Sequence, residues 1–216
     1  LRSVHGIEVN DDSYMPQFAD DVFSQPLPPK VPDGMTQLVF AGNIGRMQAV
    51  DVLVRAADML RDQPVRWHIV GDGSEYEACV RLAKELHVET LVTFYGRKPL
   101  EDMPAFYAMA DALLVSLRDD VSVNDTLPGK VQGYMAAGRP VLGSIAGETP
   151  YVIEQAQCGF CAPPGDAQAF AQAVQRFLAA PDAIAMGRRA REYYEAHFTK
   201  KNHIDRLERM LLDLCG

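Results

Sequence analysis

The glycine-containing segment Gly42-Asn43-Ile44-Gly45 has residue types suited to binding a phosphate group. It follows the apolar run Leu38–Ala41 and precedes a helical pattern that starts at Val50. Small residues let the backbone approach a ligand closely, and free amides at the start of a helix attract anions. The same four residues also fit an ordinary tight turn, so the segment is a candidate phosphate loop with a purely structural alternative.

A second candidate runs from Asp125 through Thr126, Leu127, Pro128 and Gly129 to Lys130, at the start of a helical pattern. Proline suits the first helical turn because its missing N–H would have no partner there. Thr126 and Leu127 would then present free amides, with Lys130 one turn into the helix. A cation beside the positive end of a helix is unfavourable unless an anion binds there. This local conflict predicts an anion site.

Two further turns follow apolar runs. The glycines of Gly71-Asp72-Gly73-Ser74 suit positive φ, and Asp72 or Ser74 could cap the next helix. Asp72 could instead bind a ribose hydroxyl in a dinucleotide fold, although the first loop is G-x-x-G rather than G-x-G-x-x-G. Gly96 is followed by Arg97 and Lys98, which fit either a ligand contact or a solvated basic turn.

The composition is that of a globular protein. The chain has 216 residues, of which 48% are hydrophobic, enough for one domain with a full core. Its net charge of -8 argues against sequence-independent binding of nucleic acid, which needs a surplus of Lys and Arg. No apolar run approaches the ~18 residues of a membrane span. Residues 1–6 contain neither an initiating Met nor a signal peptide, so we expect a piece of a longer protein.

The four cysteines give little sign of a metal site. Only Cys158 and Cys161 have a ligand-like spacing, and no second Cys or His pair matches them. We interpret the cysteines as cytosolic thiols rather than as metal or redox groups.

From Leu38 onward, short apolar runs alternate with segments of helical periodicity, which is the βαβ pattern. We predict strands at 38–41, 67–70, 91–95, 112–117, 140–144 and 159–162, and helices at 50–60, 75–86, 103–109, 128–137 and 149–155. Three more helices are predicted between 167 and 214. The fold class is therefore α/β, a Rossmann-like parallel sheet with helices on both faces plus C-terminal helices. We expect residues 1–37 to be a Pro-rich linker that enters the domain, 38–165 to be the Rossmann-like domain, and 166–216 to be C-terminal helices that pack on it or towards a preceding domain. Ligands of such sheets bind at the carboxyl ends of the strands, where the loops described above lie.

Six segments together form a recognisable pattern by their order and spacing: Gly42–Gln48, Ile69–Gly73, Val92–Gly96, Tyr107–Asp111, Leu127–Lys130 and Tyr134–Val141. Through these segments the region from Leu38 to about Cys161 resembles the donor-binding domain of the retaining family 4 (group 1) glycosyltransferases, one half of the two-domain GT-B fold. The segment Tyr14–Ala19 also resembles the one that enters this domain in exopolysaccharide and O-antigen sugar transferases.

The resemblance implies roles by position. Gly42 to Gly45 would face the donor diphosphate, the Gly96-Arg97 turn would contact the nucleobase, and Asp125 to Lys130 would hold the transferred sugar and the phosphates. The implied catalytic residues are Asp125 and Lys130. The implied donor-binding residues are Gly42, Asn43, Gly45, Arg46, Gly71, Asp72, Gly96, Arg97, Thr126 and Leu127.

Two departures from the family pattern matter. Relatives often have cations at the positions of Asn43 and Gln48, so here Lys130 and Arg46 are the available cations. Relatives also commonly carry two Glu residues eight apart, where this chain has Asp125 and Gly133. The ribose must then be recognised by another group, or less well.

The resemblance implies transfer of a hexose, with retention, from a nucleotide diphosphate sugar, by preference UDP-linked, to a glycan or lipid-linked acceptor in cell-surface polysaccharide synthesis. No Asp-x-Asp pair occurs, so we expect no metal or other cofactor. Other implied features are a missing N-terminal domain, no transfer by this fragment alone, and a cytoplasmic location, with the inner membrane face as one option. The alternatives are a catalytically degenerate nucleotide-sugar-binding module and a nicotinamide-dependent oxidoreductase.

Overall fold

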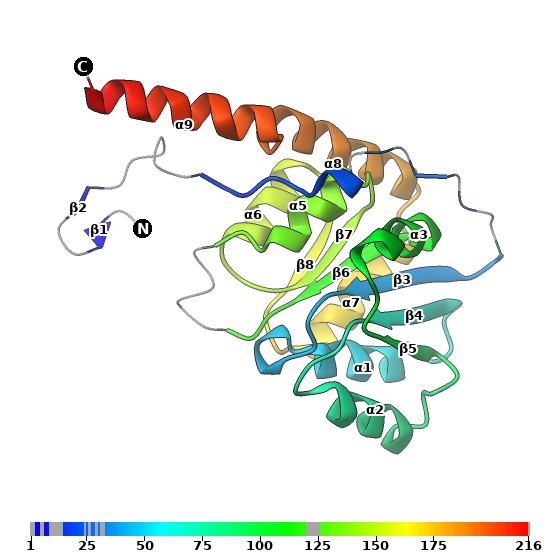
Figure 1. Ribbon diagram of the computed structural model, residues 1–216. Helices are drawn as coiled ribbons and strands as arrows, with labels where there is room; N and C mark the ends of the chain where they lie inside the picture. The colour runs from blue at the N-terminus through cyan, green and yellow to red at the C-terminus, as the bar shows by residue number, and fades with distance from the viewer. Residues whose placement is uncertain are drawn as a thin grey trace.

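The computed structural model describes residues 3–4, 7–8, 15–23, 25, 27–28, 30, 33–119 and 126–215. A six-stranded parallel sheet forms its centre, in the order β5-β4-β3-β6-β7-β8 (Figure 1). Its strands are β3 (Thr36–Ala41), β4 (Val65–Val70), β5 (Val92–Gly96), β6 (Ala112–Ser116), β7 (Val141–Ser144) and β8 (Gly159–Ala162). Two short strands, β1 (Ser3–Val4) and β2 (Ile7–Glu8), form a separate antiparallel pair.

Helices connect the strands and cover both faces of the sheet, so the predicted α/β class is confirmed. The α-helices are α1 (Val50–Met59), α2 (Tyr76–Glu85), α3 (Met103–Met109), α5 (Gly129–Ala136), α6 (Glu148–Gln155), α7 (Ala167–Leu178), α8 (Ala183–His197) and α9 (Lys200–Cys215). The 3-10 turns are η2 (Asp21–Phe23), η3 (Arg46–Gln48) and η4 (Leu100–Asp102). Helix α3 and strand β8 have the bounds that the periodicity predicts, and the other predicted strands and helices up to β8 differ from the observed ones by one or two residues at one or both ends.

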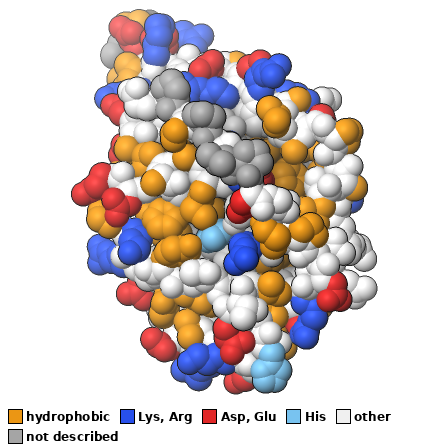
Figure 2. Space-filling model, turned by 90° about the vertical axis from the view of Figure 1, so that its right-hand side faces the viewer, with side chains coloured by type: hydrophobic (Ala, Val, Ile, Leu, Met, Phe, Trp, Pro, Cys, Tyr) orange, Lys and Arg blue, Asp and Glu red, His pale blue; other side chains and the backbone are white. Residues whose placement is uncertain are grey.

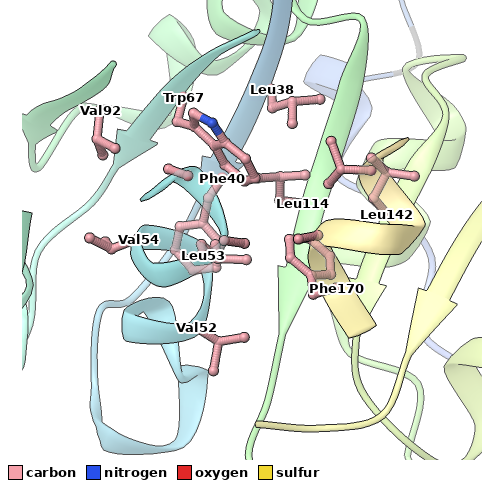
Figure 3. Close-up of a cluster of buried hydrophobic side chains, with 14 of the residues drawn as sticks. Leu38, Phe40, Val52, Leu53, Val54, Trp67, Val92, Leu114, Leu142 and Phe170 are labelled. Carbon is pink, nitrogen blue, oxygen red and sulfur yellow. The ribbon is translucent and has the colours of Figure 1, made fainter. Parts of the chain in front are cut away.

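Two hydrophobic cores lie on the two faces of the sheet, because successive residues of a strand point to opposite sides. On one face Leu38, Phe40 and Trp67 pack with α1, α2 and α7, and Phe170 of α7 approaches Trp67 with a ring-centroid distance of 6.4 Å (Figure 3). On the other face Val39 and Leu113 pack with α3, α5, α6 and α8. Strands buried on both faces read as continuous apolar runs, which is why the sequence locates them well.

The three C-terminal helices behave differently from one another. Helix α7 packs on the sheet beside α1, and α8 packs against α5. Helix α9 extends away from the sheet (Figure 1) and leaves Ile204, Leu207, Leu211 and Leu212 exposed. Within the part of the chain that the structure describes, no helix is long and apolar enough to cross a membrane.

A row of hydrogen-bonded polar side chains crosses strands β3, β4 and β5. His68 Nδ1 lies 2.8 Å from the Tyr95 hydroxyl, and His68 Nε2 lies 2.6 Å from Gln37 Oε1. Gln37 Nε2 in turn donates to Asp33. Gln37 and His68 line a hollow of about 580 Å³ with Lys30 and Arg66. Figure 2 views the molecule from the α3 side, where a histidine is visible among hydrophobic and basic side chains.

Candidate functional site

The loops that follow β3, β4 and β5 interlock at the carboxyl edge of the sheet. The Gly42 amide donates to the Val70 carbonyl at 2.9 Å, and the Gly71 amide donates to the Gly96 carbonyl at 2.9 Å. Gly71, with φ +137°, approaches so closely that a Cβ atom on it would lie 1.8 Å from the Gly42 carbonyl oxygen. A Cβ on Gly73, at φ +156°, would lie 2.6 Å from the Ile44 backbone. Glycine is therefore required at both positions, as their predicted positive φ suggests.

A cavity of about 730 Å³ opens at this edge of the sheet. Its walls come from the three interlocked loops, the start of α5, the segment 97–107, and a segment that precedes the sheet. The lining residues are Phe18, Ala19, Asp20, Phe23, Ala41, Gly42, Asn43, Val70, Gly71, Asp72, Gly73, Arg97, Lys98, Leu100, Met103, Tyr107, Gly129, Lys130 and Gly133. A large concave site at the carboxyl ends of parallel strands is where ligands of this fold bind.

Helix α5 starts at the wall of this cavity, to which its first residues Gly129 and Lys130 contribute. Pro128 is its N-cap, with φ -60° and ψ 131°, and the helix begins at Gly129. The prediction that Pro128 stands in the first turn is therefore wrong by one residue, since Pro128 has extended geometry. The free amides at this helix start belong to Gly129 and Lys130 rather than to Thr126 and Leu127. Lys130 stands in the first turn, closer to the positive helix end than the sequence predicts.

Lys130 is the most unusual side chain of the site. Its Nζ atom is buried and has no hydrogen-bond partner among the described residues. It lies 4.1 Å from the centroid of the Phe40 ring, which gives a cation–π contact. Burial lowers the pKa of the Lys130 amine from 10.5 to about 8. A buried cation that has no carboxylate partner among the described residues, at the positive end of a helix, would be stabilised by a bound anion.

Tyr134 fixes the position of Lys130 relative to strand β3. Its hydroxyl donates to the Ala41 carbonyl at 3.1 Å and accepts from the Ala41 amide at 3.3 Å. The side chain is completely buried, and burial raises the pKa of its hydroxyl well above 10. One turn of α5 is thereby fastened to the residue before Gly42, so Lys130 and the glycine loop lie side by side.

The glycine loop itself offers little charge. Asn43 Nδ2 donates to Gln48 Oε1 at 3.0 Å, so these two uncharged side chains bind each other. The amides of Gly42, Ile44 and Gly45 are already used within the fold. Among the described residues, only the Asn43 amide of this loop lacks an acceptor. The loop therefore supplies close backbone approach, and the positive charge comes from elsewhere.

The structure brings together six of the residues that the sequence proposes for the site: Gly42, Asn43, Gly71, Asp72, Arg97 and Lys130. Gly45 and Arg46 lie in a separate groove of about 250 Å³ with Asp51, Glu75 and Arg118. Gly96, Thr126 and Leu127 neighbour the cavity in sequence without lining it. Asp125 lies outside the described residues.

The prediction that Asp72 or Ser74 caps the following helix is wrong. The N-cap of α2 is Glu75, and no side chain caps this helix end. Asp72 Oδ1 instead accepts from the adjacent Gly73 amide at 2.8 Å. The intervening turn places Asp72 toward the cavity rather than over the helix start.

Sequence reasoning missed the contribution of residues 15–23. Phe18, Ala19, Asp20 and Phe23 form one wall of the cavity, although this Pro-rich stretch reads as a linker. The Phe23 ring stacks on Tyr107 at 4.9 Å and lies 3.4 Å from the position of a Cβ atom on Gly133. Two phenylalanines among polar and Pro residues were the available signal, because a solvated linker has no need of large aromatic side chains.

The thiols play no part in this site. Burial raises the pKa values of Cys158 and Cys161 to about 12, so both are protonated at neutral pH. No group of three or more His, Cys, Asp or Glu residues that could hold a metal ion is found in residues 33–119 and 126–215 or the shorter described stretches.

Comparison with known proteins agrees with this geometry. The family described as "Glycosyl transferases group 1" matches residues 36–180. The chain belongs to this family. It is 27% identical over 179 residues to N-acetyl-alpha-D-glucosaminyl L-malate synthase of Bacillus anthracis, covering 82% of this chain and 45% of that protein. It is 25% identical over 181 residues to the putative colanic acid biosynthesis glycosyl transferase WcaI of Escherichia coli K12, with coverages of 80% and 42%.

The same fold occurs in solved GT-B glycosyltransferases. HepE of Anabaena, solved in complex with UDP and glucose, superposes with a TM-score of 0.72 at 16% identity, covering 93% of this chain and 55% of that one. The predicted resemblance to one half of a GT-B enzyme is confirmed at the level of family and fold. This chain spans less than half the length of the two curated relatives described above.

Proposed function

We propose that this chain is the donor-binding half of a glycosyltransferase that transfers a sugar, with retention and without a metal, from a UDP-sugar to a glycan or lipid-linked acceptor in cell-surface polysaccharide synthesis. The buried, unpartnered amine of Lys130 in the cavity carries this proposal. Membership of the group 1 family supplies the reaction class, and it removes the nicotinamide oxidoreductase alternative.

The diphosphate would lie between the start of α5 and the glycine loop. There the Gly129 and Lys130 amides stand in the first turn of the helix, the Asn43 amide has no acceptor among the described residues, and the Lys130 amine supplies the charge. Arg97 and Lys98 add two more cations to the lining. Donors that are already in place stabilise negative charge without reorganisation, and this stabilisation is strong in a water-poor site. When the bond between sugar and diphosphate breaks, the charge that develops on the leaving oxygen would fall on these groups.

UDP is the preferred nucleotide because HepE, which shares this fold, was solved with UDP and glucose. A polysaccharide role is supported by the likeness to the colanic acid transferase WcaI. The acceptor would be held by residues of a longer protein, and transfer would need that protein, whereas donor binding would need only this chain.

A catalytically degenerate nucleotide-sugar-binding module is the second candidate. Its support is the Asn43–Gln48 hydrogen bond, which leaves the glycine loop neutral, and the missing side chain at Gly133. Such a module would keep the nucleotide site and lose only turnover.

Titration calorimetry of the 216-residue chain with UDP and GDP tests the donor site. Lys130→Ala should weaken UDP binding roughly 10- to 100-fold, as expected for loss of a charge-assisted contact of about 1.5–3 kcal/mol. Arg46→Ala is the matched control, because Arg46 lies in the separate groove, and it should change the affinity less than twofold. Absence of heat with either nucleotide at several millimolar would overturn the donor site, and the reverse ranking of the two variants would show that the charge lies in the first loop.

The enzyme and the binding module are separated by turnover of the natural full-length protein. Release of UDP from a UDP-sugar in the presence of acceptor, undiminished by EDTA and lost in Lys130→Ala, supports the transferase. Binding of UDP-sugar without release under any acceptor condition supports the module.

A further inference from the structure

We propose that Asp20, on the segment that precedes the sheet, is the residue that recognises the ribose hydroxyls of the bound nucleotide and so determines specificity for ribonucleotides. This inference rests on the proposed function, since it assigns a binding residue to the ribose of the nucleotide that is proposed to bind in this cavity. Only two carboxylates, Asp20 and Asp72, line the cavity among the described residues.

The first step is the layout of helix α5. Lys130 and Gly133 are three residues apart, so they share one helical face at about 5–6 Å between Cβ positions. The phosphate-binding amine therefore stands one turn from a position without a side chain. Both residues line the cavity.

Phe23 fills the space in front of Gly133. Its ring atoms lie 3.4 and 3.5 Å from the position of a Cβ on Gly133, and its other side stacks on Tyr107 at 4.9 Å with an interplanar angle of 17°. A Cβ atom at position 133 would be in van der Waals contact with this ring, so a carboxylate-bearing side chain there would have to share the space with Phe23. The cavity wall beside the second turn of α5 is therefore an aromatic ring, which is not an acceptor for a normal hydrogen bond from a ribose hydroxyl.

Asp20 is held beside Phe23 by the backbone. The Phe23 amide donates to the Asp20 carbonyl at 3.0 Å, which closes the turn, and the Val22 amide donates to Asp20 Oδ1 at 3.1 Å. These bonds occupy one carboxylate oxygen and leave Oδ2 without a hydrogen bond among the described residues. An ionised carboxylate has further acceptor capacity, and vicinal ribose hydroxyls are donors that match it.

The segment that carries Asp20 is anchored at three places. His203 Nδ1 of α9 donates to the Pro16 carbonyl at 3.1 Å, and the Phe18 ring meets the His203 ring edge-on at 5.3 Å. Ala19 is buried, and Phe23 is clamped between Tyr107 and Gly133. Asp20 is thus exposed on a backbone that is fixed on both sides, which is the preorganisation a recognition residue needs.

The two carboxylates lie in different parts of the cavity wall. A carboxylate repels phosphate, so a lining Asp is expected to bind an uncharged part of the ligand. Asp72 lies in the loop that interlocks with the glycine loop, where its carbonyl accepts from the Ile44 amide at 2.8 Å. Asp20 follows Phe18 and precedes Phe23, and both rings contribute apolar lining suited to the nucleoside.

The test compares three ligands on four proteins. UDP, 2′-deoxy-UDP and inorganic pyrophosphate are titrated by calorimetry into the unaltered chain, Asp20→Asn, Asp21→Asn and Asp72→Asn. Asp20→Asn keeps an oxygen for the Val22 amide but replaces the free acceptor with an NH₂ donor. Asp21 is the control because it is exposed, neighbours Asp20 and does not line the cavity.

We expect the unaltered chain and Asp21→Asn to bind UDP about tenfold more tightly than 2′-deoxy-UDP, as for one good hydrogen bond. Asp20→Asn should bind the two nucleotides within twofold of each other, with no loss of pyrophosphate affinity. Retained discrimination in Asp20→Asn, or its loss in Asp72→Asn instead, would overturn the assignment of Asp20. Failure of the unaltered chain to bind UDP at all would overturn the proposed function, which is a different result.

Discussion

The Lys130 amine lies 2.7 Å from the position that a Cβ atom on Gly42 would occupy. Glycine at position 42, directly after β3, thus leaves room for a lysine side chain from α5, a helix that follows β6 three strands later in the chain. The amine lies 4.1 Å from the centroid of the Phe40 ring, and the Tyr134 hydroxyl, one turn along α5, ties the helix to Ala41.

Gly42→Ala should weaken UDP binding at least tenfold while leaving the chain folded. The new methyl group would displace the end of a flexible side chain, and φ of +149° adds backbone strain of about 1–3 kcal/mol. Calorimetric affinity and thermal unfolding, measured on the same protein, check both halves of the prediction.

Gly71→Ala provides the contrast, because its Cβ would meet the rigid Gly42 carbonyl at 1.8 Å. The free energy of unfolding of this variant should fall by several kcal/mol, so that the protein is no longer cooperatively folded at 37 °C. If Gly42→Ala and Gly71→Ala lost equal stability, the Lys130 side chain would not be moving aside for the new methyl group at position 42.

Lys130→Met should stabilise the unliganded chain at neutral pH. The folded-state pKa of about 8 lies below the value of 10.5 for an unburied lysine, so the native state bears the full cost of the buried charge at pH values below about 8. That cost, about 3 kcal/mol, disappears as pH rises from about 8 to 10.5, because the unfolded chain then binds more protons than the native state. Urea unfolding at pH 7 and pH 10 should show a stability gain that shrinks at the higher pH. A gain of equal size at both would mean that the amine is not desolvated.

UDP affinity should fall as pH rises through about 8, since only the protonated Lys130 amine attracts the diphosphate. Between pH 8 and 9.5 the loss should be roughly tenfold, in a range where the terminal phosphate is already ionised. Lys130→Met should bind weakly and show a flat profile over the same range. A profile of unchanged slope in this variant would assign the titration to another group.

The sheet was predictable because its strands are buried on both faces, as the run Leu38–Ala41 illustrates. The importance of Lys130 was also readable, from the conflict between its charge and the helix start. Its exact place was not, since the position of the helix start depends on the extended geometry of Pro128. Asp20 and Phe23 could not be assigned from local sequence, because their contacts with Tyr107, Gly133 and the cavity span about half of the chain and depend on how the segment returns to the sheet edge.

Tyr134→Phe should cost about 1–2 kcal/mol of stability and also weaken UDP binding severalfold. The hydroxyl bonds to both the amide and the carbonyl of Ala41, and loss of these two hydrogen bonds accounts for the expected cost. Loss of this tie lets α5 shift relative to β3 and moves Lys130 from its place beside Gly42. Denaturant unfolding and calorimetry test the two effects separately. Lowered stability with unchanged affinity would restrict Tyr134 to a structural role.

In His68→Phe, the free energy of unfolding should fall less steeply as the pH is lowered from 6.5 toward 4 than it does in the unaltered chain. Burial, aided by Arg66 and Lys30 and opposed by Asp33, lowers the pKa of His68 from 6.5 to about 4. The unfolded chain therefore binds more protons between these values, so the native state loses stability as pH falls from 6.5 toward 4, by about 2–3 kcal/mol. The Tyr95 hydroxyl and Gln37 lose a partner in the variant, so its stability at pH 7.5 should be lower than that of the unaltered chain. The difference in unfolding free energy between the two proteins, measured at pH 7.5, 6, 5 and 4.5, should narrow as the pH falls. A constant difference across this range would show that His68 does not become charged on unfolding, and would leave the acid sensitivity of the chain to its carboxylates.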